Sequence, residues 1–192
     1  MASPGQVRGI AIKPNWEYLF KEHGEKTRAL ESEFERLGYP FSFDKISPMQ
    51  FYPIGHDVLF FVLAKQIFNL SDEEFFQMGV YGTKTSFFLK IAFRYFISPK
   101  STLEQVPSLW KKYYTVGDFS VEEMDMDGRR VILHLSNFSI PHKRNFCHNL
   151  RGYLATLWSI AMGTKVLCEE VLCAFEDDSP RHIFVLTWGE EK

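Results

Sequence analysis

The sequence predicts an α+β fold, with a helical N-terminal half packed beside an antiparallel four-stranded sheet in the C-terminal half. Two observations lead to this prediction. Apolar residues recur at helical spacing over residues 14–114, and from residue 119 onward the pattern changes to hairpin, helix, hairpin. No linker long enough to divide two units interrupts the 192 residues. We therefore expect residues 1–192 to form a single domain.

Six helices are predicted in the first half, from apolar spacing and from residues that start or stop helices. Pro14 suits a first helical turn, and Gly24 interrupts the pattern that follows it. Ser71 and Glu74 have the spacing of a capping box, in which each side chain satisfies the other residue's backbone N–H. Pro99 ends the fifth helix because the residue before a proline avoids helical geometry. The predicted helices are residues 14–23, 27–37, 56–68, 71–79, 81–97 and 103–114.

Two hairpins with one helix between them are predicted in the second half. Asp127-Gly128 is a pair that suits a two-residue type I′ turn in the first hairpin. Residues 144–162 carry one apolar stripe and are followed by Gly163, which is typical of an amphipathic helix and its stop. The second hairpin turns across a polar segment at residues 176–180. The predicted strands are residues 119–126, 129–138, 165–175 and 182–188.

Composition and charge argue against several classes of protein. The 22 basic and 24 acidic residues give a net charge of −2, so nothing favours a nucleic-acid partner. The longest apolar stretch, residues 58–64, is too short to span a membrane, and the N-terminus has no apolar run of signal-peptide length. Three cysteines, an odd number, indicate reduced thiols. We therefore expect a cytoplasmic protein with no membrane span.

The order and spacing of several short segments resemble a known superfamily over about positions 7–188. The segments are Arg8-Gly9-Ile10, Glu22-His23-Gly24-Glu25, Phe51-Tyr52-Pro53, Asn69-Leu70-Ser71-Asp72-Glu73-Glu74, Leu133-His134-Leu135-Ser136 and Thr187-Trp188. They resemble the haem–nitric-oxide-binding superfamily, whose other branches include 4-vinyl-reductase domains and TRAPP vesicle-tethering subunits. The likeness is greatest to its uncharacterised single-domain bacterial paralogues. It implies a sensory or ligand-binding domain.

The haem-binding branch needs residues that this chain lacks. A haem iron takes an axial ligand from the protein, and the resemblance places the family's axial histidine near Leu109, where Trp110 stands. The family's Tyr-x-Ser-x-Arg motif would follow His134, but residues 135–139 contain neither the tyrosine nor the arginine. We therefore do not expect haem.

The 4-vinyl-reductase branch implies a zinc site, for which this chain has a partial match. Cys147 lies on the predicted long helix, and Glu170-x-x-Cys173 lies on the next strand. Arg181 stands where the last cysteine would fall, with His182 beside it. Two thiolates, a carboxylate and an imidazole could hold tetrahedral zinc. However, positions i and i+3 of a regular strand point to opposite faces, so Glu170 and Cys173 converge only if the strand bulges. Cysteine is also common in protein cores, so zinc is kept as an alternative.

The aromatic content predicts either a well-filled core or a core that encloses an apolar pocket. Aromatic residues make up 16% of the chain, with 19 phenylalanines. If a pocket exists between the helical half and the sheet, polar side chains should orient its ligand. The candidate pocket residues are Phe60, Phe88, Arg94, Tyr95, Trp110, Tyr113, His134 and Trp158.

No motif for catalysis or phosphate binding occurs, so we do not predict an enzyme. The favoured hypothesis is a non-catalytic sensory domain that binds a small hydrophobic molecule. Its output would pass through a homodimer or a signalling protein. The alternatives are an interaction or scaffold module with a filled core and a zinc-containing, 4-vinyl-reductase-like domain.

Overall fold

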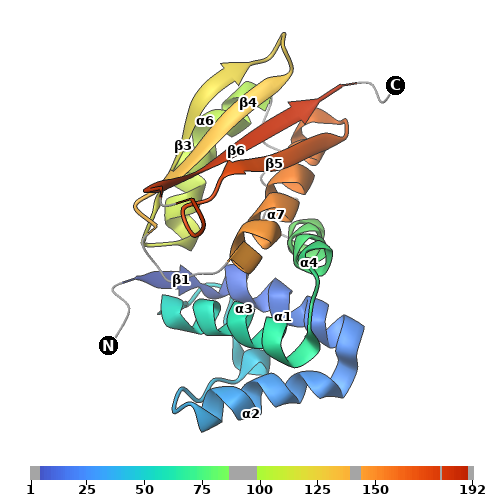
Figure 1. The fold of residues 1–192 in the computed structure, drawn as a ribbon, viewed down its shortest axis with the longest axis vertical. Helices are drawn as coiled ribbons and strands as arrows, with labels where there is room; N and C mark the ends of the chain where they lie inside the picture. Colours follow the sequence, from blue (N-terminus) through green and yellow to red (C-terminus); the bar gives the residue numbers. More distant parts are fainter. Residues whose placement is uncertain (1–4, 87–98, 139–143, 178, 190–192) are drawn as a thin grey trace.

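An antiparallel four-stranded sheet with helices on one face forms the C-terminal half of the molecule. The computed structural model describes residues 5–86, 99–138, 144–177 and 179–189. The strand order is β3–β4–β6–β5, and α6 and α7 lie behind the sheet in Figure 1. The elements are α6 (Pro99–Tyr113), β3 (Asp118–Asp125), β4 (Arg130–Ser136), α7 (Arg144–Met162), β5 (Val166–Leu172) and β6 (Arg181–Trp188). The predicted fold class is confirmed.

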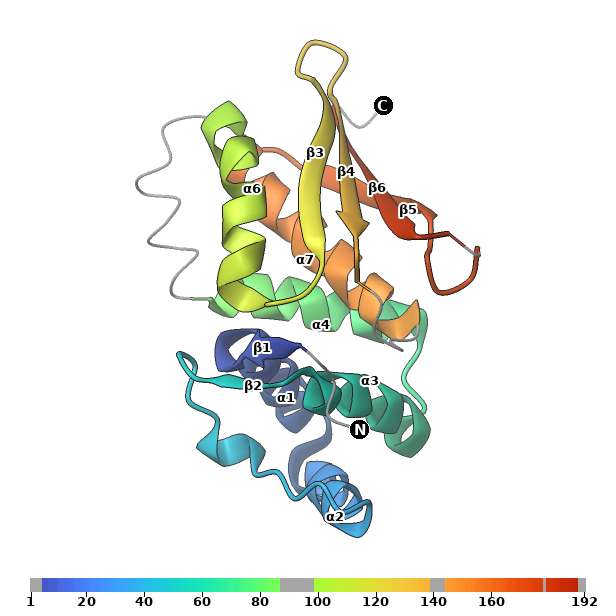
Figure 2. The ribbon, with the colours of Figure 1, turned by 90° about the vertical axis from the view of Figure 1, so that its left-hand side faces the viewer.

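The N-terminal half is a group of helices beside this layer. Figure 2 shows α4 between the sheet layer and the other N-terminal helices. The elements are β1 (Gln6–Arg8), α1 (Gly9–His23), α2 (Arg28–Arg36), β2 (Phe51–Pro53), α3 (Ile54–Phe68) and α4 (Asp72–Thr85), with short 3-10 turns at Gly24–Thr27 and Phe43–Lys45. Strands β1 and β2 form a second, two-stranded antiparallel sheet. This small sheet was not predicted, because three-residue strands are too short to show an alternating pattern.

Several helix boundaries differ from the prediction, and those of α1 and α4 differ most. Helix α1 begins at Gly9 rather than at Pro14, because the backbone N–H groups of Gly9 and Ile10 donate to carbonyls of the loop at residues 48–50. That loop supplies acceptors which the local sequence cannot reveal. Helix α4 has the predicted capping box but continues to Thr85 instead of ending near Gly79. Residues 81–85 of the helix predicted at 81–97 therefore belong to α4, and residues 87–98 lie outside the described part.

The turn of the first hairpin is longer than predicted. Residues 126–129 connect β3 to β4, and the residue with positive φ is Arg129 (56°). The carboxylate of Asp125 accepts a hydrogen bond from the Gly128 N–H at 2.7 Å. A type I′ turn would need positive φ at both Asp127 and Gly128, so that prediction is wrong. The Asp125 carboxylate stabilises the four-residue connection instead.

Helices α4 and α7 cross with their backbones in contact, and two glycines allow it. A Cβ atom on Gly79 would lie 1.9 Å from the carbonyl oxygen of Asn149, and one on Gly152 would lie 2.0 Å from that of Phe76. The Thr83 hydroxyl, at 3.2 Å from the Tyr153 carbonyl oxygen, adds a polar contact at the same crossing. The crossing therefore fixes the position of α7 relative to the N-terminal helices.

Substituting either glycine at this crossing should weaken folding. We expect Gly79→Ala and Gly152→Ala each to lower the free energy of unfolding by about 3 kcal/mol, because the added methyl group displaces a backbone rather than a flexible side chain. Gly55→Ala in α3 is the matched control, since a Cβ there meets nothing within 4 Å. It should change stability by less than about 1 kcal/mol. Chemical denaturation measures all three, and equal stability of Gly152→Ala and Gly55→Ala would contradict this account of the crossing.

Candidate functional site

A cavity lies where the N-terminal helices meet α6, α7 and the sheet. It has a volume of about 110 Å³. An apolar cavity of ~150 Å³ holds benzene, so the described space suits a molecule of about that size. The lining residues are Ile10, Ala11, Pro14 and Asn15 from α1; Gly79, Gly82 and Ser86 from α4 and its end; Val106, Leu109, Trp110, Tyr113 and Tyr114 from α6 and its end; Phe119 from β3; and Phe146, Asn149, Leu150, Tyr153, Leu154 and Leu157 from α7.

The polar groups of this lining are the amides of Asn15 and Asn149, the Ser86 hydroxyl, the Trp110 indole and three phenols. The Asn149 side chain donates to the Asn15 side-chain oxygen at 3.2 Å, and the Asn15 amide donates to the Ala11 carbonyl. The Trp110 indole N–H is already used, because it donates to the Val116 carbonyl at 2.9 Å. Within the described lining there is no acidic, basic or histidine side chain. The described part of the cavity wall is therefore uncharged and mainly apolar.

The predicted pocket residues are distributed over several places. Trp110 and Tyr113 line the cavity. Phe60 lies in the core of the N-terminal half, where its ring packs against Phe43, and Trp158 is buried on another face of α7. His134 pairs with Glu122 on the face of the sheet opposite the helices. Phe88, Arg94 and Tyr95 lie outside the described residues.

Most of the cavity residues were not anticipated, and five of these have polar side chains: Asn15, Ser86, Tyr114, Asn149 and Tyr153. On α7 the cavity residues are 146, 149, 150, 153, 154 and 157, which follow the i, i+3, i+4 spacing of one helical face. Asn149 interrupts this otherwise mostly apolar face. This single polar residue on an apolar helix face was the sequence signal that could have indicated a cavity. Its partner Asn15 could not be identified without the tertiary structure.

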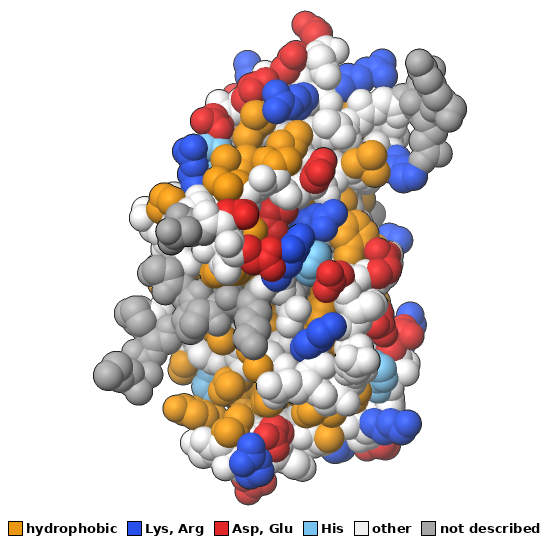
Figure 3. Space-filling view, in the orientation of Figure 1, with side chains coloured by type: hydrophobic (Ala, Val, Ile, Leu, Met, Phe, Trp, Pro, Cys, Tyr) orange, Lys and Arg blue, Asp and Glu red, His pale blue; other side chains and the backbone are white. Residues whose placement is uncertain are grey.

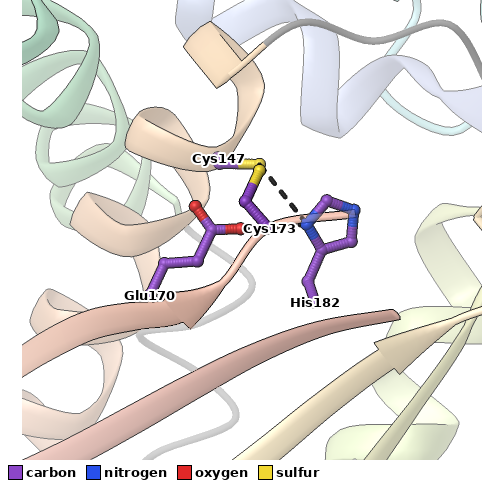
Figure 4. Close-up of side chains that lie close together, drawn as sticks. All are labelled: Cys147, Glu170, Cys173 and His182. Atoms are coloured by element: carbon purple, nitrogen blue, oxygen red, sulfur yellow. Dashed lines mark hydrogen bonds and ion pairs between the residues drawn. The ribbon is translucent and has the colours of Figure 1, made fainter. Parts of the chain in front are cut away.

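A second site is a buried cluster of four metal-ligand side chains between α7 and the sheet. Cys147 comes from α7, Glu170 from β5, Cys173 from the turn after β5 and His182 from β6. Figure 4 shows their polar ends pointing toward one another. One potential ligand atom from each residue lies within 4.8 Å of all the others. The structure therefore brings together the four residues that the sequence suggested for zinc.

The strand irregularity that this convergence required is present. The register of β5 against β6 shifts between Glu170 and Leu172, and β5 ends at Leu172. Cys173 then lies in a turn, where its N–H donates to the Asp177 carboxylate at 2.6 Å and its carbonyl accepts from two following N–H groups. Glu170 and Cys173 therefore reach the same side of the sheet.

The cluster distances are close to those of a tetrahedral metal site. The Cys147 and Cys173 sulfurs are 3.8 Å apart, and the Cys147 sulfur is 3.6 Å from His182 Nδ1. Zinc–sulfur bonds of ~2.3 Å and zinc–nitrogen bonds of ~2.05 Å at tetrahedral angles give separations of about 3.8 and 3.6 Å. His182 Nδ1 and Glu170 Oε1 are 2.9 Å apart, which is a hydrogen-bond distance. The donor set fits zinc with a small change at that pair.

The electrostatics of the two thiols differ. The hydrogen bond between them raises the pKa of Cys147 and lowers that of Cys173, and burial further raises that of Cys147.

The His182 and Glu170 side chains are 1% and 5% exposed. His182 Nε2 is buried with no hydrogen-bond partner among the described residues. A histidine that binds a metal usually has its second ring nitrogen hydrogen-bonded. In the described structure, His182 Nε2 lacks such a hydrogen bond.

Comparison with solved structures shows the fold. The chain matches an H-NOX protein from S. oneidensis in the Fe(II)NO ligation state, with a TM-score of 0.68, 11% identity and coverage of 96% of this chain and 100% of the other. A variant Fe(II) unliganded H-NOX protein from K. algicida matches with a TM-score of 0.66, 13% identity and coverage of 96% and 97%. An oxygen-binding H-NOX domain related to soluble guanylate cyclases matches with a TM-score of 0.64, 11% identity and coverage of 96% of each chain. These likenesses establish an H-NOX-like fold.

The other comparisons add no family. No protein-family model and no curated protein sequence matches the chain. The structural neighbours support the haem–nitric-oxide-binding side of the resemblance and not the 4-vinyl-reductase side. Among the described helices, none is long and apolar enough to cross a membrane.

The expectation that haem is absent needs correction. It rested on missing motif residues, but the solved structures with this fold include an Fe(II)NO complex, an oxygen complex and one described in terms of haem redox potential and porphyrin distortion. Haem is the cofactor of this fold in those proteins. Missing motif residues are therefore no ground for excluding haem here.

The described cavity lining can be tested against the needs of haem iron. It contains no histidine, cysteine or methionine, and its tyrosines 113, 114 and 153 are the only described lining residues of a type that ligates haem iron. Burial raises the pKa of all three, which disfavours the phenolate that an iron would need. The described lining therefore does not fit a histidine-ligated haem, and no step below depends on haem. Haem remains one of the ligands to be tested.

Proposed function

We propose that this chain is a sensory domain that binds a small, mainly apolar molecule in the cavity between its two halves. The observation that carries the proposal is the cavity itself, whose described lining has no charged side chain and comes from α1, α4, α6, α7 and β3. A pocket with apolar walls and a few polar groups is the usual form of a small-molecule site. The H-NOX neighbours add support at the level of fold.

The position of the cavity indicates how a ligand would act. Its walls belong to both halves of the molecule, so an occupant contacts α1 and α4 on one side and α6 and α7 on the other. A ligand changes a conformational equilibrium only by binding one state more tightly than another. Occupancy would favour the arrangement in which both walls meet the ligand, and a partner protein or a second copy would read that arrangement.

The alternative of an interaction module with a filled core has less support. The cavity leaves part of the interior unfilled. On the outward face of the sheet, charged side chains interrupt the hydrophobic ones (Figure 3), including the pairs Glu122–His134 and Glu123–Arg130. A flat, continuous apolar face is the feature that this alternative requires.

Cavity binding can be tested with toluene as the probe. At ten times its dissociation constant, toluene should raise the Tm by roughly 3–5 °C and shift the NMR signals of cavity residues. Gly82→Leu should abolish both effects, because Gly82 lines the cavity and a side chain there extends into it. Gly55→Leu is the control, since its Cβ meets open space in α3.

Two results would decide against the small-molecule proposal. One is the absence of any toluene effect on the parent protein. The other is tight binding of haem, titrated in parallel by absorbance, that Gly82→Leu prevents; this result would make haem the occupant. Equal toluene binding by Gly82→Leu and Gly55→Leu would place the site outside the cavity.

A second proposed function is a structural metal site at Cys147, Glu170, Cys173 and His182. The observation that favours it is the convergence of four ligand atoms at near-tetrahedral separations. Zinc sites that use four protein ligands are typically structural, whereas catalytic sites keep one position for water. The ion would join α7 to the turn after β5 and to β6, and would supply the counter-charge for two buried thiolates and a carboxylate.

Metal analysis tests this second proposal. Protein purified without chelator should contain one zinc per chain by elemental analysis, and Cys147→Ser and Cys173→Ser should lose it. Cys168→Ser is the matched control, because Cys168 is a buried cysteine outside the cluster. Removing a zinc that had been present at 1,000 times its dissociation constant should lower the free energy of unfolding by about 4 kcal/mol. Parent protein that takes up no zinc on addition of the ion would refute the site.

A further inference from the structure

Three tyrosines give the cavity a distinctive polar region. Tyr113 ends α6, Tyr114 follows it, and Tyr153 lies on the cavity face of α7. All three residues therefore contribute phenol side chains to the lining of one cavity, two from the end of α6 and one from α7.

These hydroxyls have no partner within the described structure. None of the three hydroxyls forms a hydrogen bond with a described residue. None is fully buried without a hydrogen-bond partner either, so each oxygen keeps some accessible surface. Each tyrosine is partly buried and lines the cavity. By contrast, the Trp110 N–H and the Asn15 amide are satisfied within the protein. The three phenols are therefore available to donate to a ligand.

The phenols remain protonated donors at neutral pH. Burial raises the pKa of Tyr113, Tyr114 and Tyr153 above the ordinary value of 10.0, and for Tyr114 the Asp57 carboxylate adds to the effect. The described lining contains no cation that could neutralise an anionic ligand and no anion that could neutralise a cationic one. Burying an unpaired charge is strongly unfavourable, whereas a neutral oxygen acceptor would satisfy the phenols.

We propose that the cavity selects an uncharged, mainly apolar molecule that carries a hydrogen-bond-acceptor oxygen, such as a ketone or an ester, bound by the hydroxyls of Tyr113, Tyr114 and Tyr153. This inference rests on the proposed binding function of the cavity and specifies its ligand class. Apolar walls hold the hydrocarbon part, and the phenols orient the oxygen. A pure hydrocarbon of the same shape binds, but more weakly.

Three probes of nearly equal shape test the inference. Acetophenone has the acceptor oxygen, α-methylstyrene replaces that oxygen with a CH₂ group, and benzoate adds a negative charge. By NMR titration at pH 7, acetophenone should bind at least about fivefold more tightly than α-methylstyrene, which corresponds to one neutral hydrogen bond. Benzoate should bind most weakly of the three.

Tyrosine variants locate the effect. Tyr153→Phe and Tyr113→Phe should each reduce acetophenone affinity toward that of α-methylstyrene and leave α-methylstyrene affinity unchanged. Tyr39→Phe is the control, because Tyr39 is 53% exposed and does not line the cavity. Unchanged Tm values for the variants would show that they fold normally; if one variant unfolds, the other still tests the hydroxyl.

The outcomes separate this inference from the function on which it rests. Equal binding of acetophenone and α-methylstyrene, or tightest binding of benzoate, would overturn the ligand class while leaving cavity binding intact. Insensitivity of acetophenone to both tyrosine variants would also overturn it. Failure of every probe, including toluene, to bind the parent protein would instead refute the binding function itself.

Discussion

The close crossing of α4 and α7 is the contact on which the rest of the structure depends. Gly79 and Gly152 let each helix lie against a backbone carbonyl of the other, so the distance between the helices is set by main chain rather than by adaptable side chains. Helix α7 packs on the sheet and α4 packs against α1. The crossing therefore joins the two halves, and the cavity forms beside it, with Gly79 and Asn149 in both.

Helix α7 carries both candidate sites on different faces. Residues 146, 149, 150, 153, 154 and 157 face the cavity, while Cys147 and Trp158, eleven positions apart and so on one side of the helix, face the sheet. A metal held by Cys147 would fix the N-terminal part of α7 to the sheet. Two candidate sites therefore share one helix.

Much of the fold was predictable because its longer elements have strong local signals. Helix α7 was predicted at its observed bounds, 144–162, from one amphipathic stripe, and the capping box at Ser71 and Glu74 was predicted from spacing alone. The errors occur where long-range contacts decide a boundary. Helix α1 begins at Gly9 because the loop at residues 48–50 accepts its first N–H groups, and α4 continues beyond Gly79 because packing on α7 outweighs the low helix propensity of glycine.

The sequence by itself determined the α+β class and the order of the main elements, since both depend on residue type and spacing. The four residues for zinc were suggested by the resemblance to the 4-vinyl-reductase branch. The bulge after Glu170 that brings it to the side of Cys173 was decided only by tertiary structure, because the register of β5 depends on its pairing with β6. The cavity was likewise decided by packing. Trp110 and Tyr113 were predicted as cavity residues, but the Asn15–Asn149 pair joins segments 134 positions apart, and the three tyrosines of the lining come from α6, its end and α7. No local sequence pattern predicts these long-range contacts, because they depend on how the helices and the sheet pack against one another.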